Sequence, residues 1–185
     1  MLKVEKLSLN RGAKTITEQL TFHLKKGELL KLSGPNGSGK SSLAMAIAGD
    51  IPKTSGEIKC DGKIGYLMQS LEIDFPITVT EFIQLARPKA DIRNLLEKLN
   101  LIEISNKKIT QISMGQLQRA EIAQILLQDP DLIILDEPFS AQDAENTLNL
   151  VRLIENLKSE GKSFMLINHI DMDISDLVDQ EISLG

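Results

Sequence analysis

A glycine-rich stretch at residues 34–42 constrains this chain more than any other feature of its sequence. Gly34 and Gly39, followed directly by Lys40 and Ser41, fit the phosphate-binding loop pattern. In such a loop the backbone N–H groups turn inward, the lysine reaches the terminal phosphates and the serine hydroxyl binds Mg²⁺. The pattern therefore predicts a nucleoside triphosphate site made by Gly34, Pro35, Asn36, Gly37, Ser38, Gly39, Lys40, Ser41 and Ser42.

The segments on either side of the loop suit this interpretation. Residues 28–32 have the pattern of a short strand, and residues 42–48 that of a helix whose N-terminus points at the phosphates. A glycine- and serine-rich turn without a ligand would not require a strand before it and a helix after it. The loop alone does not choose among kinases, small GTPases, motor ATPases and transporter ATPases.

Length and composition exclude several classes of protein. With 185 residues, 42% of them hydrophobic, the chain can bury a core and fits one domain better than two. No apolar run reaches the roughly 18 residues that a membrane-spanning helix needs, and the start alternates like a strand rather than forming a signal peptide. We therefore expect a cytoplasmic chain without linkers or an appended regulatory domain.

Charge and residue types exclude further functions. One cysteine and two histidines predict neither a disulfide framework nor a zinc cluster. A net charge of −5 with 3% aromatic residues argues against a nucleic-acid surface, which needs basic or stacking side chains.

Hydrophobic periodicity predicts an α/β fold. Residues 3–10 and 19–24 alternate like antiparallel strands, and residues 57–60 and 63–68 read as a hairpin joined through Asp61-Gly62. Helical patterns follow from residue 78 to Pro88, with apolar residues on one side that include Leu85, and from residue 90 to 99. A third helix begins after the cap Ser113 and stops before Asp129-Pro130.

The second half of the chain places acids at a sheet edge. The apolar run 132–135 is typical of a strand buried in a parallel sheet, and it delivers Asp136 and Glu137 at its carboxyl end, where ligands bind. We expect Asp136 to bind Mg²⁺ and Glu137 to act on the attacking water. A helix at 144–159 and a strand at 163–167 then lead to His169 at the same edge.

Together, these motifs resemble those of the ATP-binding cassette (ABC) family of transporter ATPases. They are the phosphate loop, Gln69, the Ser113-Met114-Gly115-Gln116 signature, the Asp136-Glu137 pair, Ser140-Ala141-Gln142-Asp143 and His169. The resemblance covers the whole chain. It implies one domain, 1–185, with a mostly parallel sheet and a small antiparallel β part in residues 1–70 and 129–185. A helical subdomain that carries the signature is expected at 71–128.

The resemblance also implies roles for single residues. Lys40 and the amides of Gly37 to Lys40 cradle the ATP phosphates, and Ser41 and Asp136 hold Mg²⁺. Gln69 senses the metal and the nucleophile. Glu137 polarises the water and His169 contacts the terminal phosphate. In the ATP-bound state a head-to-tail homodimer is implied, in which residues of one subunit close on the nucleotide held by the other. The residues that close on the nucleotide are Ser113, Gly115 and Gln116. Asp143 belongs to the loop that crosses between subunits.

Three positions depart from the family pattern. Met114 replaces a glycine in the signature, where we expect it to hinder close approach to the nucleotide. The aromatic residue that stacks on adenine is missing, and Arg11 stands near its place, where its guanidinium plane can stack. Gln142 replaces an apolar residue, a change that we expect to be tolerated.

Shorter stretches resemble the ATPases of zinc and manganese importers, the zinc type especially. The segment 57–66 runs through without the longer insertion of most relatives, and Asp74 to Val79 and Leu85 to Pro88 are similar too. The resemblance implies an integral membrane permease as partner, and a location on the inner face of the membrane. Phe75 is the predicted anchor for a helix of that permease.

Two other functions compete with this interpretation. Soluble ABC ATPases serve repair, translation or cluster assembly, but they carry coiled coils, paired cassettes or basic extensions that this chain lacks. A small-molecule kinase would explain the loop at 34–41 but would leave the signature and His169 unused. Hydrolysis of ATP without an acceptor, and co-purification with a permease, separate the three.

Overall fold

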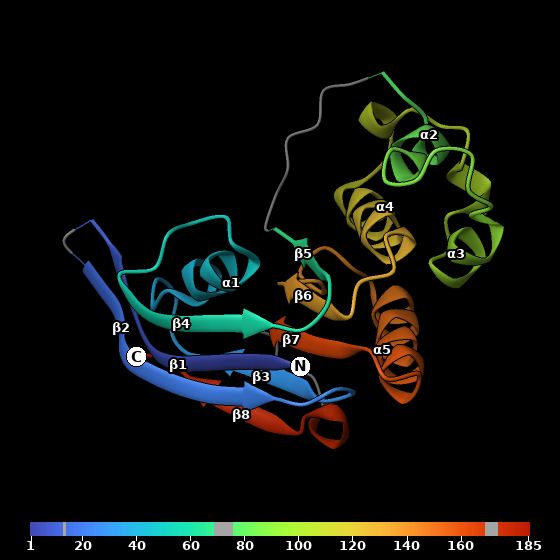
Figure 1. Ribbon diagram of the computed structural model, residues 1–185. Coiled ribbons are helices and arrows are strands. Elements are labelled where there is room, and N and C mark those ends of the chain that lie inside the picture. Colours follow the sequence, from blue (N-terminus) through green and yellow to red (C-terminus); the bar gives the residue numbers. More distant parts are fainter. Residues whose placement is uncertain (13, 69–75, 169–173) are drawn as a thin grey trace.

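Figure 1 shows the computed structural model, which describes residues 1–12, 14–68, 76–168 and 174–185. Its centre is a five-stranded sheet in which every neighbouring pair of strands is parallel. In spatial order the strands are β5 (Ile64–Leu67), β6 (Leu132–Asp136), β7 (Ser163–Ile167), β3 (Leu29–Ser33) and β8 (Gln180–Ser183). All five residues of β6 and of β7 are buried, as continuous apolar runs predict for central parallel strands.

A second, antiparallel sheet lies beside the first. It contains β1 (Leu2–Arg11) between β2 (Lys14–Leu24) and β4 (Ser55–Cys60). Leu2 of β1 pairs with Leu24 of β2 and with Cys60 of β4. The predicted antiparallel pair at the start of the chain and the mostly parallel α/β fold are therefore confirmed.

The predicted hairpin through Asp61 and Gly62 is wrong. The strand before this turn, β4, belongs to the antiparallel sheet, whereas the strand after it, β5, pairs in parallel with β6. Asp131 explains the change of direction, because its carboxylate accepts a hydrogen bond from the backbone N–H of Lys63 at 2.9 Å. A side chain at Gly62, whose φ is 117°, would collide with the same carboxylate. The turn thus anchors the chain beside the start of β6 instead of folding it back on β4.

The two faces of the parallel sheet pack into two separate hydrophobic clusters. Alternate residues Ile133 and Leu135 of β6 join a cluster with the helices after residue 78, while Leu132 and Ile134 join one with the antiparallel sheet. The helix α1 (Lys40–Ala48) belongs to the second cluster through Leu43 and Ile47. In Figure 1, α1 accordingly lies on the same side of the parallel sheet as β4, and the later helices lie on the other side.

The helices between residues 78 and 128 are shorter than predicted, except the one after Ser113. They are α2 (Val79–Gln84), α3 (Arg93–Lys98) and α4 (Met114–Leu127), with 3₁₀ turns at Ile102–Ile104 and Ile109–Gln111. Figure 1 shows them as a group above one end of the parallel sheet. Thr78 caps α2, whose Val79, Phe82 and Ile83 are buried. Leu85 is an exception to the predicted apolar side, because α2 ends before it and 65% of its surface is exposed.

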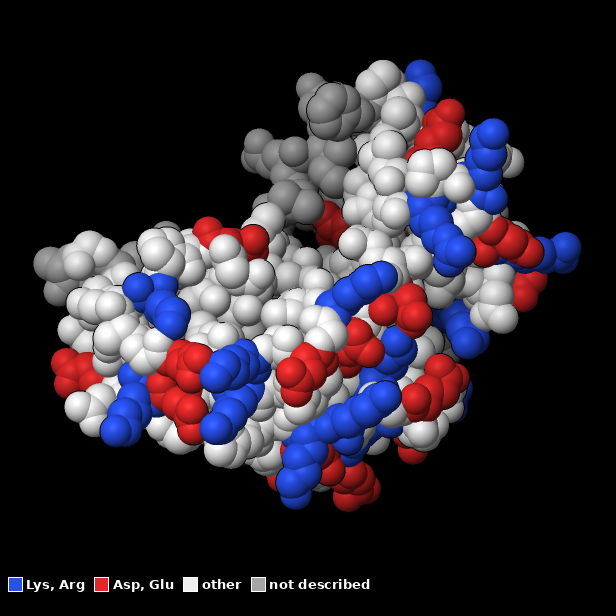
Figure 2. All heavy atoms as spheres, in the orientation of Figure 1, with Lys and Arg blue, Asp and Glu red and all other residues white. Residues whose placement is uncertain are grey.

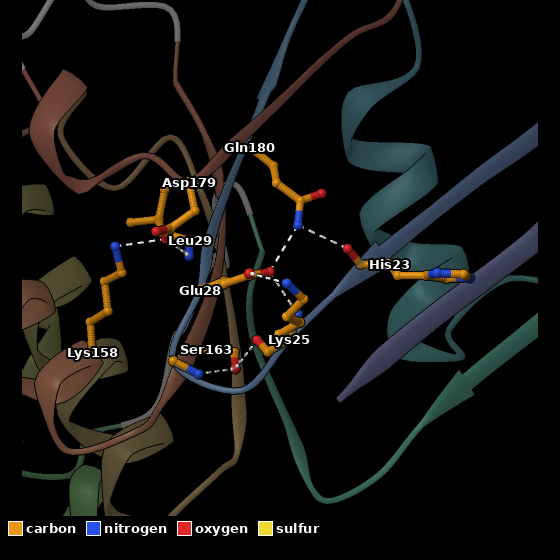
Figure 3. A network of polar contacts seen from close by, with 9 residues as sticks. His23, Lys25, Glu28, Leu29, Lys158, Ser163, Asp179 and Gln180 are labelled. Atoms are coloured by element: carbon orange, nitrogen blue, oxygen red, sulfur yellow. Dashed lines mark hydrogen bonds and ion pairs between the residues drawn. The ribbon is translucent and has the colours of Figure 1, made fainter.

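Polar contacts join the strands at the amino edge of the parallel sheet (Figure 3). Asp179, just before β8, accepts a hydrogen bond from the Leu29 N–H at 2.7 Å and pairs with Lys158 at 2.7 Å. Lys158 belongs to α5 (Ala144–Ser159), so this aspartate ties a helix to the start of β3. Gln180 donates to the carbonyl of His23 and to the carboxylate of Glu28. His23 itself is an exposed strand residue.

Charge is mixed over the face drawn in Figure 2, where lysine and arginine side chains lie between aspartates and glutamates. Among the described residues, no helix combines the length and the apolar character needed to cross a membrane.

Candidate nucleotide-binding site

The predicted phosphate loop connects β3 to α1 at the carboxyl edge of the parallel sheet. Gly39 precedes α1 with φ 106°, a left-handed conformation that favours glycine, and a Cβ there would collide with Ile16 of β2. Lys40 begins the helix and folds back over the loop, where its ammonium donates to the carbonyls of Gly34 at 2.9 Å and Pro35 at 3.0 Å. The loop thus holds the lysine at its own rim.

Three observations show that this loop suits phosphate oxygens. The hydroxyl of Ser38 is buried and has no hydrogen-bond partner in the protein. The first turn of α1 has no acidic residue and no side-chain cap, so its N–H groups and the positive end of its dipole are available to an anion. Lys40 is only 5% exposed, and an anion beside it would compensate the burial of its charge.

The acid pair lies within electrostatic range of Lys40. Desolvation lowers the pKa of Lys40, and the negative charges of Glu137 and Asp136 oppose that shift. Asp136 ends β6 and is 2% exposed, so its carboxylate has little access to water. The structure therefore gathers Lys40, Asp136 and Glu137 at one edge of the sheet. With Ser41 at the second position of α1, Asp136 supplies the hard oxygen ligands that Mg²⁺ prefers.

Glu137 has an unusual backbone. Its φ is 54°, a left-handed conformation that is rare for a residue with a long side chain. Its N–H donates to the carbonyl of Ile167 in β7 at 2.9 Å. Its carbonyl accepts from the hydroxyl of Ser140 at 3.0 Å, from the Ser140 N–H at 3.2 Å and from the Gln118 amide at 3.1 Å. Contacts on both sides of the peptide hold the acid in this conformation.

The predicted signature forms the N-terminus of α4. Ser113 caps the helix through a capping box, accepting from the Gln116 N–H at 3.2 Å while its own N–H donates to the Gln116 side chain at 3.0 Å. Met114 is 59% exposed and points away from the core. Gly115 is buried, and a Cβ there would collide with the carbonyl of Ala141. The start of α4 therefore packs directly on the loop at 140–143.

That loop ends at Asp143, which caps α5. Its carboxylate accepts hydrogen bonds from the backbone N–H and from the side-chain amide of Asn146, both at 2.8 Å. These hydrogen bonds lower the pKa of Asp143, and the positive charge of Arg119 adds to the effect. In this chain Asp143 thus has a capping role, whatever it contacts in a dimer.

Three predicted functional positions are outside what the structure describes. Gln69 and His169 lie in the ranges left out, as does Phe75 with its predicted role in permease binding. The stacking role predicted for Arg11 concerns a side chain that is likewise outside the described part of the chain.

The sequence did not reveal two residues near the site. Tyr66 of β5 is partly buried with its hydroxyl inside the protein, and desolvation raises the pKa of its phenol, to which the negative charges of Asp136 and Asp50 contribute. Its place near Asp136 follows from the strand register of the structure, which pairs Tyr66 with Ile134, two residues before Asp136 on the neighbouring strand. Ile16, which packs against Gly39, belongs to β2 and has no local signal at all.

Comparisons with known proteins give a consistent result. A family model described as ABC transporter matches residues 17–140. A zinc import ATP-binding protein of Hahella chejuensis is 35% identical over 164 residues, which make up 86% of this chain but 64% of that protein. A zinc import ATP-binding protein of Yersinia pestis is 34% identical over 177 residues, or 91% of this chain and 70% of that protein.

Solved structures agree in fold over the full chain. An ABC transporter assigned to the metal-chelate type, in an inward-facing conformation, superposes with a TM-score of 0.88 at 28% identity, covering 100% of this chain and 79% of that one. A dimeric ATP-binding cassette bound to ADP and phosphate gives a TM-score of 0.84 at 25% identity, covering 100% of this chain and 94% of that one.

Proposed function

Since this chain belongs to the ABC transporter family, as an ATP-binding subunit whose ATP hydrolysis drives transport, we propose that it powers the import of zinc through a separate membrane permease. One structural observation carries the ATPase part of the proposal. Lys40, Asp136 and Glu137 lie together at the carboxyl edge of the parallel sheet. The adjacent loop contains the buried Ser38 hydroxyl, which has no hydrogen-bond partner in the protein. The substrate follows from the two relatives, which are named for zinc import.

The residues of this chain divide the work of phosphoryl transfer. Lys40 and the N–H groups at the start of α1 bind and orient the phosphates of ATP. Ser41 and Asp136 would hold Mg²⁺, which neutralises charge on the phosphate oxygens when it is bound. Glu137 orients a water molecule in line with the terminal phosphate and accepts its proton. Gln69 and His169 are proposed to complete the contacts to the metal and the terminal phosphate.

A second copy of the chain completes the site. We propose a head-to-tail homodimer in the ATP-bound state, in which Ser113, Gly115 and Gln116 close on the partner's nucleotide. The capping box engages the Ser113 oxygen as an acceptor, which leaves its hydroxyl hydrogen available to a phosphate oxygen. The dimeric cassette with ADP and phosphate supports this arrangement. The permease would bring the pair to the inner face of the membrane.

The test measures ATP binding, hydrolysis and zinc uptake in vesicles that contain the chain and its permease. Glu137→Gln keeps the shape but removes the proton acceptor, so we expect ATP binding within about twofold of wild type and hydrolysis lower by about 100-fold or more. Lys40→Ala should lose ATP binding as well. Glu155→Gln, an exposed residue of α5, is the matched control and should behave as wild type.

Two results would overturn the proposal. If Glu137→Gln hydrolysed ATP at the wild-type rate, Glu137 would not be the proton acceptor. Hydrolysis that proceeds normally while the chain neither binds the permease nor supports zinc uptake would indicate a soluble ABC ATPase instead.

A further inference from the structure

A chain of side-chain amides connects the signature helix to the backbone of Glu137. The Gln118 amide nitrogen, on the second turn of α4, donates to the Glu137 carbonyl at 3.1 Å. The Gln118 amide oxygen accepts from the amide nitrogen of Gln142 at 2.7 Å. Gln142 in turn donates to the carbonyl of Gly115 at 3.1 Å and accepts from the Arg119 guanidinium at 2.8 Å.

The groups at the ends of this chain fix the orientation of both amides. The Arg119 guanidinium can only donate, so the oxygen of Gln142 faces it. The carbonyls of Gly115 and Glu137 can only accept, so the nitrogens of Gln142 and Gln118 face them. Any reversal of one amide would place two donors or two acceptors against each other. The network therefore has one arrangement, which runs from Arg119 through Gln142 and Gln118 to Glu137.

The network contacts the backbone at Glu137, whose conformation is unfavourable without such contacts. The φ of 54° at Glu137 is a conformation that a glutamate adopts only when its surroundings impose it. Ser140 holds the carbonyl from within the same turn, whereas Gln118 reaches it from α4. The backbone direction at this residue sets where its carboxylate points. A misdirection of about 1 Å at a reacting group can reduce a rate about 100-fold.

At position 142 this chain has a glutamine, whereas an apolar residue is common at this position in the ABC family. An apolar side chain would fill the same space but could neither receive Arg119 nor orient Gln118. Arg119 is 8% exposed, so its guanidinium depends on acceptors inside the protein. Gly115 lies directly against the backbone of Ala141, the residue before Gln142, so the signature and this loop are in close contact.

We propose that Gln142 is a positioning residue. Through Gln118 it fixes the backbone of Glu137, so that the carboxylate is placed to activate the water that attacks ATP, and it ties this backbone to the signature segment. This inference rests on the proposed ATPase function. Under this inference, ATP hydrolysis depends on Gln118 and Gln142, although neither residue is assigned a contact with ATP or with the attacking water. When a partner subunit closes on the start of α4, the effect would then reach Glu137 from Gly115 through three hydrogen bonds within one subunit.

The experiment compares three single variants in vesicles with the permease. Gln142→Leu removes the whole network at that position. Gln142→Glu keeps the acceptor for Arg119, and hence the local packing, but cannot donate to Gly115 or Gln118. Gln128→Leu makes the same chemical change at an exposed amide just past the end of α4, and serves as the control. Measurements are kcat, KM for ATP, ATP affinity at equilibrium and melting temperature.

We expect both Gln142 variants to lose about tenfold in kcat while KM and ATP affinity stay within about twofold. Gln142→Glu should melt within a few degrees of wild type. A kcat equal to that of Gln128→Leu in both variants would overturn the inference. So would a loss of kcat that appears only with a matching loss of ATP affinity or of melting temperature, because that is the result of a structural role alone. If the wild type itself does not hydrolyse ATP, the proposed function fails first.

Discussion

A buried acid in α4 gives this protein a stability that depends on pH. Glu121 is 8% exposed, and one of its carboxylate oxygens is buried without a hydrogen-bond partner. Desolvation raises the pKa of Glu121 from 4.5 to about 7. One pKa unit corresponds to about 1.4 kcal/mol, so the ionised carboxylate destabilises the fold by roughly 3 kcal/mol.

The sign of the effect follows from the direction of the shift. The folded protein holds the proton of Glu121 more tightly than the unfolded chain does. The contribution to stability is therefore fully present below pH 4.5 and is lost as the pH rises through about 7. Above about pH 8 the wild type carries the whole penalty, whereas Glu121→Gln carries no charge at any pH.

Thermal unfolding between pH 5 and pH 8 measures this difference. For a chain of this size, 3 kcal/mol corresponds to about 6 to 12 °C in melting temperature. We expect the gap between Glu121→Gln and wild type to widen in favour of the variant by about that amount from pH 5 to pH 8. Glu155→Gln, at an exposed site, controls for the loss of one negative charge. Curves for wild type and Glu121→Gln that stay parallel over this range would show that the carboxylate is not desolvated.

Two further predictions concern the dimer and the amino edge of the sheet. Met114→Gly, in a Glu137→Gln background, should raise the ATP-dependent dimer fraction several-fold in sedimentation, since it removes an exposed side chain from the signature; equal fractions would show that Met114 is harmless. Asp179→Asn should lower the free energy of unfolding by about 1 kcal/mol at pH 7, a modest effect because the carboxylate is partly exposed. Burial raises the pKa of Asp179, but Lys158 and the Leu29 N–H outweigh it and lower the pKa overall, so the difference from wild type should vanish as the pH falls through the folded-state pKa; a difference that persists in acid would contradict this.

Local patterns were enough for the elements that position the phosphates. Three features are each predicted by a pattern of only a few residues, and all three appear as predicted. They are the apolar run of β6, the loop at 34–42 and the cap at Ser113. Their functional roles remain predictions. The acid pair could be placed at the sheet edge because parallel strands bring their carboxyl ends together.

Contacts between distant segments could not be predicted in the same way. Asp61-Gly62 signals a turn, but whether the next strand returns to β4 or joins β6 depends on Asp131, far along the chain. Gln142 looks like an isolated replacement in the sequence, and only the packing of α4 on its loop shows its three side-chain hydrogen bonds. The burial of Glu121 is hidden for the same reason, because almost every side of α4 is covered by other elements.

The left-handed backbone of Glu137 also constrains how this protein can change over evolution. Asparagine, aspartate and glycine adopt such a φ with less strain than glutamate does. Selection for stability alone would therefore replace this glutamate with asparagine, aspartate or glycine. None of these places a carboxylate as far from the backbone as glutamate does, so none could accept the proton of the attacking water in the same position. Copies of the gene released from the need to hydrolyse ATP should lose this glutamate early, and gain stability by doing so.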